Sequence, residues 1–194
     1  MNNKNDKSFQ TKLFDAFISY GRADSKEFAK KLQARLSEQG FRVWFDFNDI
    51  PLGVDFQNQI DDGIEKACHF LFIISPHSIN SAYCGKEIEL AIKCNKHIIP
   101  LLHVEQINRE TWLSRNPNGT DDEWELYKNQ GKHTSFQNMH PTIGKINWVY
   151  FREGIDDFEK SLAGLIELLK SHSDYVEKHR NFLVKALEWE RNQK

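Results

Sequence analysis

The sequence HFLFII at residues 69–74 is an unbroken apolar run. A strand that is apolar at every position, rather than at every second one, is typical of a parallel sheet covered on both faces. Apolar residues at helical spacing follow at 81–95, and HIIPLL at 97–102 predicts the next strand. Together these segments predict a strand–helix–strand unit.

The same alternation continues on both sides of this unit. Further strands are predicted at 14–20, 41–45 and 146–151. The predicted helices are one that begins at a capping box with Asp24 as the cap and ends at Gly40, one along Phe56, Ile60 and Ile64, and a closing helix at 158–169. Repeated strand–helix pairs predict an α/β domain, with a parallel sheet and helices on both faces.

The remaining segments set the expected domain limits. Residues 1–11 are predicted to be a disordered lead, and residues 12–171 one domain. Within it, 103–145 lacks clean periodicity and predicts an irregular connection with one or two short helices. Residues 172–194 predict a C-terminal helix without a stop signal, which suggests a linker to a downstream domain.

Composition narrows the function classes. The formal net charge is −2, whereas a dedicated nucleic-acid binder is usually basic. No apolar run approaches the roughly 20 residues of a membrane span, and the polar start is unlike a signal peptide. Three cysteines (Cys68, Cys84 and Cys94) within apolar segments argue against a disulfide framework and favour the cytoplasm. No Cys/His spacing resembles a zinc site, so no metal is expected.

Glu87 is the residue that breaks its own pattern. In a helix over 81–95, Tyr83 lies one turn before it and Leu90 and Ala91 follow on the same side. A carboxylate on a mostly apolar flank is costly unless it is paired or functional. An ordinary explanation is pairing with Lys86 or Lys93; the alternative is that it serves a site.

A ligand cleft is expected where the strand order reverses. For the common order 2-1-3-4-5, that point lies beyond the carboxyl ends of strands one and three. The loops there are Ser19–Arg22 and Ser75–Ser78, and the second leads into the Glu87 helix. The chain has no Walker A motif, no G-x-G-x-x-G fingerprint, no acceptor aspartate after strand three and no G-x-S-x-G elbow.

Four motifs occur in order along the chain: FDAFISY at 14–20, FD at 45–46 with DIPLG at 49–53, S-x-Y-C-x-x-E at 81–87, and HIIPL at 97–101. Together they resemble the motifs of the TIR (Toll/interleukin-1 receptor) domain family, bacterial type. The first resembles the family's first strand, the second its second-strand end and BB loop, the third its W-C-x-x-E helix motif with Tyr in place of Trp, and the fourth its fourth strand. The resemblance covers roughly residues 12–170 and implies a flavodoxin-like three-layer sandwich of five parallel strands in the order 2-1-3-4-5. The connection at 103–145 departs from the family pattern.

The family also implies two alternative functions. Some members are signalling scaffolds, whereas others cleave the nicotinamide–ribose bond of NAD+ with the glutamate that matches Glu87. Nicotinamide leaves as a neutral molecule, so the need is to stabilise positive charge on the ribose, which one carboxylate can do. Attack by water would give ADP-ribose, and attack by the adenine ring a cyclic product; both remain open. NAD+ would be the substrate, with no cofactor.

Six further residues are candidates for binding this substrate. Each has an ordinary structural alternative, such as a solvated loop arginine, a loop-organising aspartate, a core aromatic or a small buried thiol. They are Tyr20, Arg22, Asp46, Phe56, Tyr83 and Cys84. Trp44 is a further aromatic considered for the site, and a place in the core is expected for it at least as much.

The resemblance finally implies partners. The loop at 46–55 would dock onto other TIR domains, and the resulting homo-oligomer or filament would complete the site. The protein would then be a cytoplasmic NAD+-cleaving hydrolase that acts as a bacterial defence or immunity effector. The alternatives are a non-catalytic TIR–TIR scaffold in signalling and, from another class, a deoxyribosyl transferase with a lone glutamate. No nucleic acid or membrane partner is expected.

Overall fold

The computed structural model describes residues 13–45, 53, 55–171 and 173–193. The predicted lead at 1–11, Asp46 and most of the loop at 46–55 lie outside these residues. Five strands form one sheet in the order β2-β1-β3-β4-β5, and each pair of neighbours is parallel. The strands are β1 (Phe14–Ser19), β2 (Val43–Trp44), β3 (Ala67–Ile74), β4 (His97–Leu102) and β5 (Val149–Tyr150). The predicted order and parallel pairing are confirmed.

The apolar run at 69–74 is the centre of the sheet. It belongs to β3, whose eight residues are all buried, between β1 and β4. Phe70 is in register with Phe17 of β1 and Ile98 of β4. The outer strands β2 and β5 are only two residues long, shorter than predicted, because their flanking residues make no further ladder pairs.

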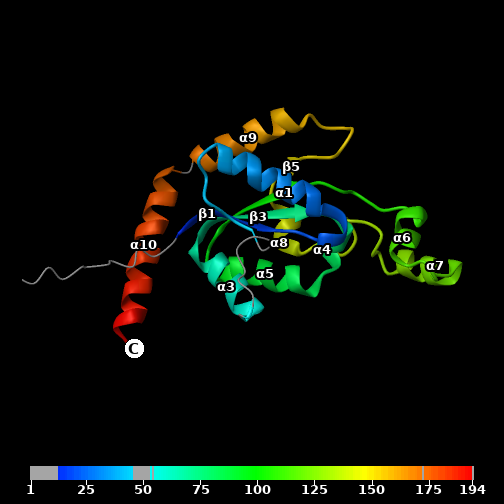
Figure 1. Ribbon diagram of the computed structural model, residues 1–194, viewed down its shortest axis with the longest axis horizontal. Helices are drawn as coiled ribbons and strands as arrows, with labels where there is room; N and C mark the ends of the chain where they lie inside the picture. Colours follow the sequence, from blue (N-terminus) through cyan, green and yellow to red (C-terminus); the bar gives the residue numbers. More distant parts are fainter. Residues whose placement is uncertain (1–12, 46–52, 54, 172, 194) are drawn as a thin grey trace, which may run out of the picture.

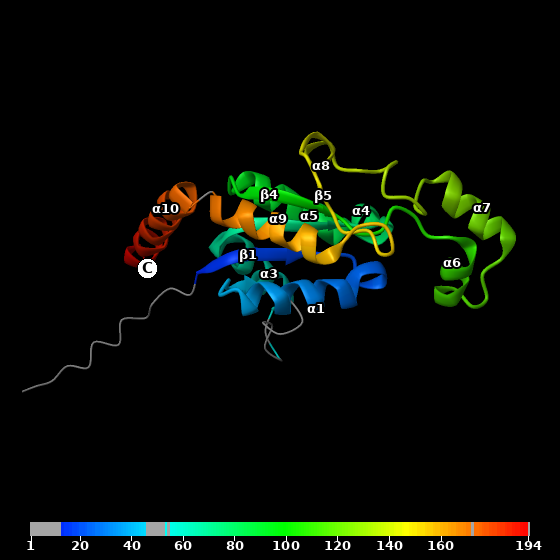
Figure 2. The same cartoon turned by 90° about the horizontal axis from the view of Figure 1, so that it is seen from above.

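Helices cover both faces of the sheet (Figures 1 and 2). One layer consists of α1 (Arg22–Glu38) and α9 (Phe158–Ser171), which bury Leu32 and Leu165 against the sheet. The other consists of α3 (Phe56–Lys66), α5 (Ala82–Lys93) and the short α8 (Pro141–Lys145). Burial of two separate apolar clusters, one on each face, gives the predicted three-layer sandwich.

Two local predictions were wrong. Asp24 is not the cap of α1, because the helix begins at Arg22, after Gly21, with no side-chain cap. The segment after β3 is not a loop but a short helix, α4 (Pro76–Asn80). It has the sequence signals of a helix start: Ser75 and Ser78 form a reciprocal capping box, and Pro76 occupies the first turn.

The segment at 103–145 is more ordered than predicted. Besides α8 it contains α6 (Arg109–Arg115) and α7 (Asp121–Asn129). The described residues of this segment thus form three helices, where one or two were expected. The α6–α7 lobe, residues 105–135, is closed at its base by a bridge between Gln106 and Thr134. Its own apolar cluster is built from Ile107, Trp112 and Trp124.

The lobe and the C-terminal helix extend from opposite ends of the domain (Figure 1). α10 (Ser173–Asn192) forms where a helix was predicted, and it buries Leu183 and contacts β3. Its role as a linker stays a prediction. In the described part of the chain no helix combines the length and the apolar character needed to cross a bilayer.

Candidate active site

A cleft of about 330 Å³ opens beyond the carboxyl ends of β1 and β3. This is the point where the chain leaves β1 for β2 on one side and reaches β3 on the other, so the cleft lies where the strand order reverses. Six of the seven predicted site residues line it, and Asp46 lies outside the described residues. The lining consists of Tyr20, Arg22, Phe56, Ile60, His77, Ser81, Tyr83, Cys84 and Glu87.

Helix α5 forms the wall that carries Glu87. Ser81 caps it by accepting a hydrogen bond from the Cys84 amide at 3.3 Å. Tyr83 and Glu87 are four residues apart and therefore share one face of the helix, which faces the cleft. The Tyr83 ring is 65% exposed, whereas Glu87 is half-buried. Ile92, an apolar residue of the same helix, is 39% exposed, because it lies beyond the edge of the face that packs on the sheet.

Cys84 joins α5 to the end of β1. Its side chain is 4% exposed, and its thiol donates to the Tyr20 carbonyl at 3.6 Å. Tyr20 in turn stacks on Phe45, with ring centroids 5.3 Å apart. These contacts hold the start of the β1–α1 loop against α5, and they leave Cys84 as a packing residue at the base of the cleft.

The opposite wall is formed by the first turn of α3. Asp55 caps this helix by accepting hydrogen bonds from the amides of Gln57 and Asn58. Phe56 follows, 44% exposed, and the Arg22 guanidinium lies 5.9 Å from its ring centroid. Trp44, the other aromatic considered for the site, is 4% exposed and stacks on Phe17 in the core.

His77 is a lining residue that the sequence analysis missed. It lies in the first turn of α4, which the reciprocal hydrogen bonds of Ser75 and Ser78 fix at the end of β3. Its Nδ1 accepts a hydrogen bond from the Ala23 amide at 3.3 Å. In the neutral ring the proton is therefore on Nε2, which makes that atom a donor. The capping sequence at 75–78 was the available signal for this ordered turn.

Asp24 connects three elements beside the cleft. Its side chain is 1% exposed, and its Oδ2 accepts from the His77 amide at 2.7 Å. Its Oδ1 lies 2.7 Å from Nη1 of Arg115, at the end of α6. Arg115 also donates from Nη2 to the Ala23 carbonyl at 2.9 Å. The α6–α7 lobe is thus fastened to the first turn of α1, which begins with Arg22. This tertiary role explains why Asp24 does not cap α1.

The cleft combines three kinds of chemistry. Glu87 offers a carboxylate in the cleft that the exposed Tyr83 and Phe56 also line, Arg22 offers a fixed positive charge, and His77 offers an N–H donor. Searched over the described residues, the chain has no group of three or more His, Cys, Asp or Glu side chains placed to hold a metal ion. The arrangement suits a ligand that has planar rings, a centre able to carry positive charge and an anionic segment.

Comparisons with known proteins agree with this geometry. The family model described as TIR domain matches residues 16–166. The 2′ cyclic ADP-D-ribose synthase BtTIR of Bacteroides thetaiotaomicron is 30% identical over 115 residues, which cover 57% of this chain and 39% of that protein. The NAD(+) hydrolase tir-1 of Caenorhabditis elegans is 30% identical over 99 residues, covering 47% of this chain and 10% of that protein.

A solved structure shows the same fold. The TIR domains of the activated Roq1 resistosome, which directly recognises the pathogen effector XopQ, superpose with a TM-score of 0.55 at 15% identity. The match covers 79% of this chain and 98% of that one. The match spans well under half the length of each of these two curated relatives.

Proposed function

Because this chain belongs to the TIR domain family, we propose that it is an NAD+ nucleosidase that cleaves the nicotinamide–ribose bond. The observation that carries the proposal is the position of Glu87. Glu87 is half-buried in a cleft that two exposed aromatic residues also line, at the point of the fold where ligands of open α/β sheets bind. The names of the two relatives, a 2′ cyclic ADP-D-ribose synthase and an NAD(+) hydrolase, support the same reaction.

The chemistry requires an anion more than an acid. Nicotinamide leaves NAD+ as a neutral molecule, so its departure needs no proton, while positive charge builds on the ribose ring. A carboxylate held in place by a capped helix stabilises that charge without reorganising. The same kind of fixed electrostatic partner, a single oxyanion-hole donor, is worth about 2.7–4 kcal/mol. Glu87 would also bind ribose hydroxyls and so fix the orientation of the sugar.

The other lining residues have separate roles in this proposal. Tyr83 and Phe56 offer faces on which the nicotinamide ring can stack. Arg22 lies at the N-terminal end of α1, and both its charge and the helix dipole favour the diphosphate. Tyr20 and Cys84 shape the base of the cleft rather than react, since both are buried.

The released product depends on what attacks the ribose. Water gives ADP-ribose, and a nucleophile within the same molecule gives a cyclic form. We further propose that the protein acts in the cytoplasm as a defence effector and that assembly with other TIR domains activates it, as the family resemblance suggests.

The test measures nicotinamide release from NAD+ at high protein concentration. Wild type should release nicotinamide, and Glu87→Gln should lose at least 100-fold in rate. Glu89→Gln is the matched control, because Glu89 lies on the same helix but points to solvent, where it pairs with His140. Equal rates for wild type and Glu87→Gln would remove Glu87 from the reaction.

The alternatives give different results in the same experiment. A scaffold would release no nicotinamide even when the domain is fused to a protein that forces oligomerisation, and that result would overturn the proposal. A deoxyribosyl transferase would exchange bases on deoxynucleosides and leave NAD+ intact.

A further inference from the structure

We propose that a second cavity, between α4 and the α6–α7 lobe, binds the adenosine half of the dinucleotide. This lobe cavity has a volume of about 600 Å³, and its lining includes Ala23, His77, Trp112, Asn118, Leu126 and Tyr127. The inference rests on the proposed function, because it extends the substrate of the same cleft into a part of the chain that departs from the family pattern.

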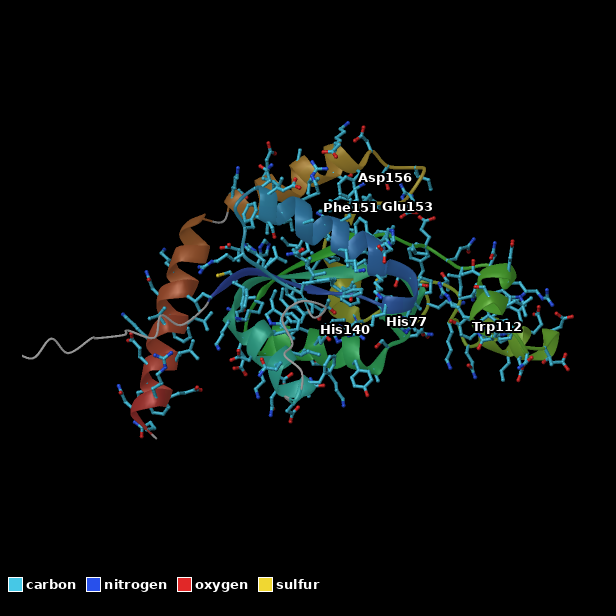
Figure 3. All side chains as sticks on the ribbon, in the orientation of Figure 1. His77, Trp112, His140, Phe151, Glu153 and Asp156 are labelled. Carbon is cyan, nitrogen blue, oxygen red and sulfur yellow. The ribbon has the colours of Figure 1, made fainter. Side chains whose placement is uncertain are left out.

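The lobe cavity and the cleft meet at a ridge formed by Arg22, Ala23 and His77. His77 lines both hollows, Arg22 lines the cleft, and its neighbour Ala23 lines the lobe cavity. Figure 3 places His77 on the side of the domain that faces the lobe carrying Trp112. A ligand that fills the cleft and passes over the ridge therefore enters the lobe cavity directly.

The size of the cleft supports this path. At about 330 Å³ it lies at the lower end of the roughly 300–1,000 Å³ range of small-molecule pockets. NAD+ consists of two nucleotides joined by a diphosphate, so a cleft of this size suits the nicotinamide nucleotide and leaves the adenosine to be placed elsewhere. The lobe cavity is the larger hollow and shares a wall with it.

The ridge has the chemistry of a diphosphate contact. The N-terminal end of the 17-residue helix α1 lies there, and the guanidinium of Arg22 stands on the cleft side. The Ala23 amide already donates to His77, which leaves Nε2 of that ring as a donor. The positive end of the α1 dipole, the Arg22 guanidinium and the His77 imidazole N–H all lie at the ridge. Together they favour an anion between the two cavities.

The lobe cavity itself suits a neutral base. Its Arg115 is paired with Asp24, and the Glu123 carboxylate accepts a hydrogen bond from the Thr120 amide. What remains is the ring of Tyr127, the apolar side chain of Leu126 and amides such as Gln130. Aromatic faces stack on purines, and amides pair with the donors and acceptors at a base edge.

The two cavities are held at a fixed spacing. The Arg115–Asp24 pair ties α6 to α1. On the other side, the Asn138 amide donates to Asn80 of α4 and to the Gln130 carbonyl, both at 2.9 Å. The lobe is thus fastened at both ends of α4, so the path from cleft to lobe cavity is built into the fold.

The test compares two substrates in lobe variants. Nicotinamide mononucleotide carries the reacting bond but lacks the adenosine half. Leu126→Glu places a charge at the cavity, and Gln130→Ala removes an amide; both residues are exposed, so the variants should fold. Glu125→Gln is the control, since Glu125 is a neighbour on α7 that does not line the cavity.

We expect Leu126→Glu to raise KM for NAD+ at least tenfold and to leave KM for nicotinamide mononucleotide within twofold of wild type. Equal effects on both substrates, or no effect on either, would overturn the assignment.

Calorimetric titration with adenosine 5′-monophosphate tests the subsite without catalysis. Wild type should bind it, and Leu126→Glu should bind at least tenfold more weakly. Loss of cleavage in wild type together with this binding pattern would refute the proposed function alone, whereas equal binding by both proteins would refute the subsite alone.

Discussion

Gly21 and His77 approach so closely that a side chain on Gly21 has no room. A Cβ atom built there would lie 2.8 Å from the His77 Nδ1 and 2.5 Å from the Ser78 amide nitrogen. The start of α1 and the start of α4 can therefore pack together only because this position is glycine. The packing brings His77 to the cleft that contains Glu87.

This contact predicts opposite effects of alanine at two glycines near the cleft. Gly21→Ala should displace α4, lower the free energy of unfolding by about 1–3 kcal/mol and reduce nicotinamide release. Gly85 lies within α5 with nothing within 4 Å of its Cβ position, so Gly85→Ala should stabilise by about 0.5–1 kcal/mol. Urea unfolding of both variants measures the difference. A Gly21→Ala protein as stable and as active as wild type would show that the two helices are free to separate.

Tyr83 should act through its ring and not through its hydroxyl. Tyr83→Ala is expected to raise KM for NAD+ about tenfold, in line with stacking energies of about 1–3 kcal/mol per base, and Tyr83→Phe to stay within twofold of wild type. Because the side chain is 65% exposed, neither change should alter unfolding by more than about 0.5 kcal/mol. Phe136→Ala, an exposed aromatic outside the cleft lining, is the control. Similar KM values for the alanine and phenylalanine variants would argue against stacking.

The Asp24–Arg115 pair should stabilise the protein more than an exposed pair does. Asp24→Asn removes the charge from a side chain that is 1% exposed and should cost about 1.5–3 kcal/mol in urea unfolding. The matched change is Asp121→Asn, which breaks the exposed ion pair with Arg109 and should cost at most about 1 kcal/mol. If the two variants lose the same stability, burial of Asp24 contributes nothing.

His103 should make stability depend on pH. Burial lowers the pKa of its imidazole, although Glu153 and Asp24 act in the opposite direction. Its Nδ1 lies 2.8 Å from the buried Ser25 hydroxyl, and its ring stacks on Phe28. Because the folded pKa lies below the ordinary value of about 6.5, the unfolded chain takes up the proton first as the pH falls.

Wild type should therefore lose stability below about pH 6.5, by at most about 1.4 kcal/mol per pH unit from this group. His103→Asn should show a shallower decline between pH 7 and pH 5 in denaturant unfolding, whatever its stability at neutral pH. Parallel curves for the two proteins would contradict the assignment to His103.

Much of the fold could be predicted because its signals are local. The run at 69–74 is apolar at every position since β3 is buried on both faces, and Ile60 and Ile64 mark α3 because one face of that helix packs on the sheet. The cleft followed from the strand order, which positions Tyr20, Phe56 and Glu87 without any knowledge of side-chain contacts.

The errors arose where distant residues decide the structure. Asp24 has the sequence context of a cap, but Arg115 lies 91 positions away and its charge favours a buried pair instead. The lobe depends on the contact between Trp112 and Trp124, whose rings lie 5.7 Å apart and give no periodic signal. The place of His77 in the cleft could not be predicted, because it depends on the close contact between Gly21 and α4.

Ser81 belongs to two helices at once, since it is the C-cap of α4 and the N-cap of α5. The chain therefore changes direction between α4 and α5 at this single residue. We therefore expect a tilt of α5, which carries Glu87, to be passed on to α4, which carries His77. Wider access to the cleft would then come from movement of the wall that carries Phe56. A glycine linker inserted after Ser81 would uncouple α4 from α5.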